Sequence, residues 1–147
     1  MRGLSCTNAD DRAEQLAALT ERLTDRIAAD TRAFEARRPH EAAARQAETA
    51  ELAALYRQET LRVRQDPTLV SAASPERRVR LKRATEAFEA VLARHGRVLS
   101  AARTVSEGLV QAIAAEVART RAPAAGYGPT ARALAGDVGA ITLSARA

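Results

Sequence analysis

The sequence is poor in the residues that build thick hydrophobic cores and chemical sites. Its 147 residues include no tryptophan, two tyrosines, two phenylalanines and one cysteine, Cys6. A single cysteine excludes an internal disulfide, and two histidines are too few for a metal cluster of the common His and Cys type. Leucine, isoleucine, valine and phenylalanine number only 28 in total. This shortage disfavours a β-sandwich, a β-barrel or an α/β core, which bulky and β-branched residues must fill.

Other absences narrow the class of protein. No apolar run approaches the ~20 residues that cross a bilayer, so membrane insertion is not expected. The first ten residues lack the basic-then-apolar pattern of a secretory signal. No pair of carboxylates, Ser/His/Asp set or glycine-rich phosphate loop can be assembled from the remaining residues. We therefore expect a cytoplasmic protein that has no cofactor and is not an enzyme.

The chain is rich in alanine, with 36 residues, and in arginine, with 22 against a single lysine. Both are strong helix formers, as are leucine, glutamate and glutamine, so the composition predicts an all-α fold. The formal net charge of +5 leaves nucleic acid or acidic proteins open as partners. Because 18 acidic residues are interleaved with 23 basic ones, the excess of positive charge is mild.

Glycine and proline mark the ends of three predicted helices. The first covers residues 10–37, where large apolar residues recur at helical spacing and Asn8 or Asp10 can cap the first turn. Pro39 then breaks or bends the chain. A second helix with an alanine-rich face covers residues 40–65, and residues 66–74 form a loop. Pro75 suits the first turn of a third helix, which runs to residue 121.

The third helix carries the most regular pattern. Ten residues alternate in steps of three and four, which is a heptad repeat typical of helices that pack side by side. They are Leu81, Ala84, Phe88, Val91, His95, Val98, Ala102, Val105, Leu109 and Ala112. The sequence predicts an elongated antiparallel helical hairpin or coiled-coil bundle of about three helices in residues 1–121, with both earlier helices antiparallel to the third. Residues 122–147 contain several prolines and glycines and are expected to form a flexible C-terminal tail.

Two features of the third helix have competing interpretations. His95 could be a pH switch or a ligand, but no second His or Cys lies within a turn or two. We therefore interpret it as a polar residue that fixes the register of the helices, and Gly96 as a close contact or slight bend. Five bases lie between residues 77 and 83, which is typical of a nucleic-acid patch. Glu76, Glu86 and Glu89 lie at pairing distance on a helix, however, so we interpret the segment as a solvated face without a nucleic-acid partner.

Two short motifs resemble the FlgN-type flagellar export chaperones. The segment ARHGRVL at residues 93–99 is similar to the family's mid-helix Asn-Gly followed by an apolar pair, with His95 in place of the usual Asn. The segment AGYGP at residues 125–129 is similar to the family's tail motif, although Thr130 and Ala131 stand where Asp-Gly is common. The last five residues, LSARA, also resemble the terminal sequence of these proteins, and the layout of helices followed by a tail matches along nearly the whole chain.

The resemblance implies a cytoplasmic chaperone of type III export during flagellum assembly. Such proteins bind the hook-associated proteins of the hook–filament junction, shield their terminal amphipathic helices and deliver them to the export gate. The apolar groove for this client would lie on the third helix, at Leu99, Ala102, Val105, Leu109, Ile113 and Val117. Tyr127 would contact the export gate. The alternative is a structural coiled coil, either a stalk component of the export apparatus or a helical homodimer.

Overall fold

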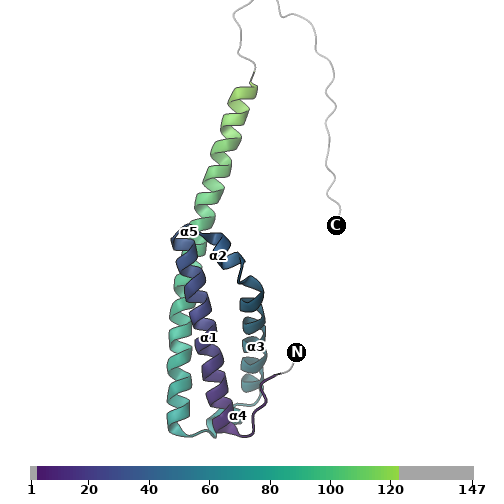
Figure 1. Ribbon diagram of the computed structural model, residues 1–147, viewed down its shortest axis with the longest axis vertical. Helices are drawn as coiled ribbons and strands as arrows, with labels where there is room; N and C mark the ends of the chain where they lie inside the picture. The colour runs from purple at the N-terminus through teal and green to yellow at the C-terminus, as the bar shows by residue number, and fades with distance from the viewer. Residues whose placement is uncertain (1–2, 123–147) are drawn as a thin grey trace, which may run out of the picture. The chain divides into compact units, whose positions relative to one another are not determined.

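All of the regular structure in the described part of the chain is helical. The computed structural model describes residues 3–122, which form α1 (Ala9–Glu35), α2 (Pro39–Ala43), α3 (Gln46–Gln65), α4 (Thr68–Ser71) and α5 (Pro75–Arg121). Figure 1 shows how they are arranged. The predicted all-α bundle with three long helices is therefore confirmed. Tyr127 and the rest of the predicted tail beyond Ala122 lie outside the described residues.

The chain divides into two units, Met1–Val110 and Gln111–Ala147. The first unit contains α1 to α4 and most of α5. In the second unit the structure describes residues 111–122, which include the last helical turns of α5.

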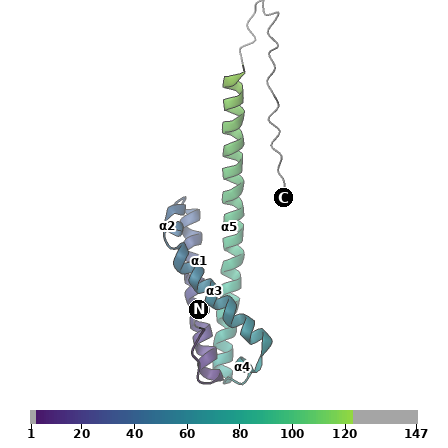
Figure 2. The ribbon, with the colours of Figure 1, turned by 90° about the vertical axis from the view of Figure 1, so that its right-hand side faces the viewer.

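Ion pairs fix the directions of the helices in the first unit. Residues of rising number on α1 pair with residues of falling number on α3 and the turn before it: Arg12 with Glu59, Arg26 with Glu48, and Asp30 with Arg45. Between α1 and α5 the residue numbers rise together: Glu14 of α1 pairs with Arg80 of α5, and Glu35 of α1 pairs with Arg94 of α5. Thus α3 is antiparallel to both other helices, whereas α1 and α5 run in the same direction (Figure 2).

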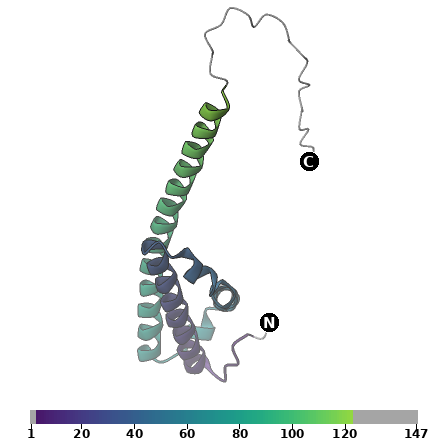
Figure 3. The same ribbon diagram turned by 45° about the horizontal axis from the view of Figure 1, so that its top comes forward.

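The expectation that both earlier helices oppose the last one is wrong for α1. Three long helices joined by short connections alternate in direction, so the first and third run parallel. Figure 3 views α3 nearly along its axis, beside the α1–α5 pair.

The end of α1 shows how Pro39 acts. The N–H groups of Arg37 and Arg38 donate to the carbonyls of Phe34 and Ala33, and Arg37 has a left-handed backbone with φ of 58°. This is a Schellman ending, in which glycine normally holds the left-handed position. Because the residue before a proline avoids helical geometry, the helix stops at Glu35 instead of bending, and Pro39 opens α2 at its first position.

The second predicted helix, residues 40–65, is divided into α2 and α3 by a turn at Ala44 and Arg45. Ala42 is buried against the fold, and Arg45 reaches back to Asp30 on α1, with 3.4 Å between Nη2 and Oδ1. These contacts favour a change of direction that helix propensity alone does not predict. The expected loop at residues 66–74 likewise contains the single-turn helix α4, whose Val70 is buried.

The core of the first unit lies where α1, α3 and α5 meet. Its buried residues are Leu16, Leu19, Leu23 and Ile27 of α1, Leu52 of α3 and Phe88 of α5. Burying each of these side chains contributes about 1.5–3 kcal/mol. A smaller cluster of Ala13, Val70 and Ala73 joins α4 to the start of α1. Most of the buried large apolar residues thus lie on α1, which packs against α3 and the N-terminal half of α5.

Candidate functional site

The heptad pattern of α5 has two different environments in the first unit. From Leu81 to Val98 its residues are buried or half-buried, and Phe88 also packs against Tyr56 of α3, with the rings tilted and their centroids 4.9 Å apart. α1 ends at Glu35, which pairs with Arg94 of α5. From Val105 onward, the same row of α5 is exposed.

The uncovered part of α5 exposes large apolar side chains. Val105 is 72% exposed, Leu109 60% and Val110 66%, while Ala102 is half-buried. Val110 was not among the residues chosen from the sequence, because it lies beside the heptad row and not in it. Val105 and Leu109 are called the exposed stripe below. In the second unit, Ile113 and Val117 are also exposed.

Leu99 belongs to a different feature, an apolar groove that α1, α2, α3 and α5 form together. The groove has a volume of about 490 Å³. Its apolar lining consists of Phe34, Pro39, Ala42, Ala43, Ala50, Ala53 and Leu99, and its polar lining of Asp30, Gln46, Thr49 and His95. We call it the α2–α5 groove. Leu99 is the one predicted client-binding residue in its lining, so the predicted set is divided between a groove and an exposed helix face.

His95 connects α5 to α1 inside this region. Its Nδ1 lies 2.9 Å from the Thr31 hydroxyl, which itself donates to the carbonyl of Ile27. Because that hydroxyl has a single proton, it accepts the second bond from an Nδ1–H of His95. The edge of the ring also meets Phe34. This placement fits the interpretation of His95 as a polar residue within the seam.

Gly96 has no packing role in the described structure. A methyl group at this position would meet no neighbouring side chain within 4 Å. The close contact expected from the sequence is therefore absent.

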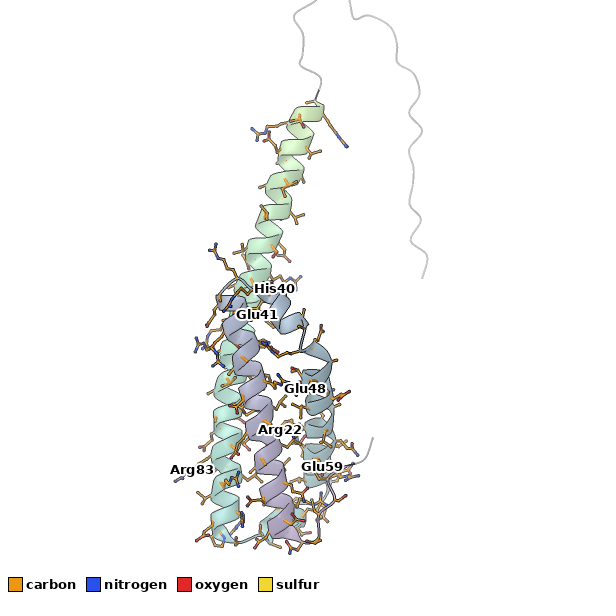
Figure 4. All side chains as sticks on the ribbon, viewed as in Figure 1. Arg22, His40, Glu41, Glu48, Glu59 and Arg83 are labelled. Atoms are coloured by element: carbon orange, nitrogen blue, oxygen red, sulfur yellow. The ribbon has the colours of Figure 1, made fainter. Side chains whose placement is uncertain are left out.

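Glu59 is a buried charge that the sequence did not single out. Its side chain is 1% exposed, and its carboxylate accepts bonds from the Leu4 N–H and from the guanidinium groups of Arg12 and Arg62 at 2.9–3.0 Å. A methyl group at Gly3 would lie 2.5 Å from Arg62 Nη1 and 2.7 Å from Glu59 Oε1, so these side chains would have to shift to admit it. Figure 4 shows Glu59 on α3, close to the N-terminal segment. In sequence, Glu59 and Arg62 look like an ordinary surface pair.

Two of the five bases at residues 77–83 pair with carboxylates of α1. Arg77 pairs with Glu14, and Arg80 pairs with both Glu14 and Glu21. The hydrogen bonds from Arg80 lower the pKa of Glu21 below its usual value. Of the pairs expected within the helix, the described residues form Lys82 with Glu86. Arg83 points away from this seam (Figure 4).

The described residues offer little for covalent chemistry or metal binding. Burial raises the pKa of the Cys6 thiol, with the charge of Arg12 partly opposing the effect, which disfavours a reactive thiolate. Within residues 3–122, His, Cys, Asp and Glu side chains form no group of three or more suited to a metal ion. No helix in this range is long and apolar enough to cross a membrane.

Together, the fold and this surface define a small helical protein with exposed apolar side chains on α5. A comparison with curated proteins finds 56% identity over 126 residues to the flagellar basal-body protein FlbY of Caulobacter vibrioides, covering 85% of each chain. The chain therefore belongs to the family of FlbY. No protein-family model matches the sequence, and no solved structure matches it. The flagellar part of the resemblance seen in the sequence is thus supported, whereas the FlgN-type assignment is a proposal.

Proposed function

We propose that the chain is a cytoplasmic export chaperone of the flagellum that has no catalytic activity and binds hook-associated proteins. The exposed stripe carries the proposal: Val105 and Leu109 continue a heptad row that packs inside the fold closer to the N-terminus of α5. Apolar faces of this kind mark interaction sites. Membership of a flagellar protein family, together with the FlgN-like motifs, supports flagellar clients.

The mode of binding follows from the shape of α5. An amphipathic client helix would lie along the exposed stripe, where Ala102 is small enough to let it approach. Leu99 would contact the client at one end of this row. Ile113 and Val117 are proposed as client contacts from the sequence pattern alone. Covering the client's apolar face keeps it from associating elsewhere before export.

Tyr127 is proposed to contact the export gate, and this part rests on the resemblance alone. We expect Tyr127→Ala to reduce secretion of a hook-associated protein without weakening its capture by the purified chaperone. Equal secretion by the variant and the wild type would remove this role.

The client surface is tested with two single substitutions, Val105→Asp and Leu109→Asp. Each places a charge on the exposed stripe, so capture of purified hook-associated proteins should weaken by about tenfold or more, while far-UV circular dichroism stays helical. Ser100→Asp is the matched control, because Ser100 is also exposed on α5 but lies on the opposite side of the helix. Wild-type binding by both stripe variants would show that this surface does not bind the client.

A structural role is the second candidate, and the description of FlbY as a basal-body protein favours it. The chain would then be a coiled-coil component of the basal body or export apparatus, or a helical homodimer. Stable self-association in analytical ultracentrifugation, together with retention in purified basal bodies, would replace the chaperone proposal.

A further inference from the structure

Residues 3–6 precede α1 and reach across to α3, and we call them the N-terminal strap. They have no helical structure, and Figure 1 shows the chain turning from the start of α1 toward α3. The Leu4 N–H donates to Glu59 Oε1 at 3.0 Å, and the carbonyl of Ser5 accepts a bond from the Gln15 side chain of α1. The Leu4 side chain is half-buried against the main core cluster. The strap is thus held in place by contacts with the folded bundle and not by regular structure of its own.

The first turn of α1 does not depend on the strap. Asn8 caps the helix by accepting a bond from the Asp11 N–H, and the Thr7 N–H donates to the Asp11 carboxylate. Both bonds lie within residues 7–11, so they persist when the strap moves. The backbone between Cys6 and Thr7 is therefore a place where the strap can rotate away from α3 while α1 keeps its cap.

Glu59 also keeps its charge partners without the strap. Its Oε2 accepts a bond from Arg12, and its Oε1 accepts one from Arg62 in addition to the bond from the Leu4 N–H. When the strap leaves, each oxygen still has a guanidinium partner, so no uncompensated buried charge is created. The interactions lost are the bonds at Leu4 and Ser5 and the partial burial of the Leu4 side chain. Moving the strap therefore requires much less free energy than opening the helical core.

We propose that the N-terminal strap opens and closes on the intact bundle and so controls access to the seam between α1 and α3 near Glu59. In the closed state Leu4 covers part of the core cluster, and Cys6 lies in a small hollow that Arg12 and Leu69 also line. In the open state this apolar surface and the Cys6 thiol face solvent. The strap is independent of the proposed function, because its contacts are with α1 and α3 and not with the exposed stripe.

Hydrogen exchange of the Leu4 amide in the full-length protein tests whether the strap opens separately. By NMR, this amide should exchange at least about tenfold more slowly than in an unfolded chain, because it donates to the buried Glu59 carboxylate. Urea below the unfolding transition should speed exchange of the Leu23 amide in the core and leave that of Leu4 nearly unchanged, since opening the strap exposes little surface. Exchange of both amides that rises equally with urea would show that the strap leaves only when the bundle unfolds. That result, or an unprotected Leu4 amide, overturns the proposal.

Thiol labelling tests what keeps the strap closed. Cys6 is the single cysteine of the sequence, so a reagent such as dithionitrobenzoate reports on the strap alone. Leu4→Ala removes most of the apolar contact that closes the strap, so labelling should become about tenfold faster. Leu61→Ala is the matched control, because Leu61 is 56% exposed on α3, and it should label at the wild-type rate. Circular dichroism checks that both variants fold. Wild-type labelling of Leu4→Ala, or equal acceleration in the two variants, would contradict the proposal.

Discussion

At the scale of single residues, Glu59 holds three segments of the chain together. Its carboxylate joins the N-terminal segment through Leu4, α1 through Arg12 and its own helix through Arg62. A buried carboxylate is tolerated only when it is paired, and removing one partner leaves the other charge uncompensated. Its role is therefore to position the N-terminal segment. The free energy lost by burying its carboxylate must be offset by other interactions.

We predict that Glu59→Ala lowers the free energy of unfolding by about 3 kcal/mol, because the largely buried guanidinium of Arg12 loses its partner. Urea unfolding followed by circular dichroism measures the change. Glu51→Ala, at an exposed position of the same helix, should change stability by less than about 0.5 kcal/mol. Comparable effects of the two substitutions would mean that the Glu59 cluster contributes no special stability.

Tyr56 predicts a pH dependence. Burial against Phe88, with a smaller contribution from the charge of Glu89, raises the pKa of the Tyr56 phenol above its usual value. The unfolded chain then loses the phenol proton more readily than the folded chain. The stability of the fold is therefore unaffected by this proton below about pH 10 and declines as the pH rises further. Wild-type stability should fall more steeply than that of Tyr56→Phe in alkaline urea titrations. Parallel curves would contradict the shift.

At the scale of elements, the end of α1 stores strain. Arg37 has φ of 58°, a conformation that glycine adopts without cost. Arg37→Gly should stabilise the protein by about 0.5–1 kcal/mol, because relief of the left-handed penalty exceeds the added freedom of the unfolded chain. Arg38, with φ of −120°, is the control, and Arg38→Gly should not stabilise. A lower melting temperature for Arg37→Gly would refute the prediction.

The helices themselves were largely predictable from the sequence. Pro39 and Pro75 open helices, Asn8 caps α1 through its side chain, and the heptad row of α5 is helical throughout. The turn at Ala44 and Arg45 was not predictable, because it depends on contacts with α1 that no local pattern contains. The same holds for the α2–α5 groove, which residues far apart in sequence form together.

At the scale of the whole molecule, large apolar residues serve two separate purposes. Leu23 is 1% exposed in the core, whereas Leu109 is 60% exposed. Leu23→Ala should cost about 2–5 kcal/mol of unfolding free energy through the cavity it creates. Leu109→Ala should change it by less than about 0.5 kcal/mol. Chemical denaturation of both variants measures these changes. A large loss of unfolding free energy in Leu109→Ala would show that Leu109 packs within the cooperative fold.

The end of α1 beside Arg94 has a consequence for the lifetime of hydrogen bonds along α5. Backbone amides from Leu81 to Val98 lie in the packed seam, so their exchange with solvent requires the bundle to open. Amides near Val105 and Leu109 are held by the helix alone and exchange through local fraying. A partner helix bound to that face would slow the exchange of amides near Val105 and Leu109 and leave exchange in the seam unchanged. Hydrogen exchange along α5 would therefore report whether a partner is bound.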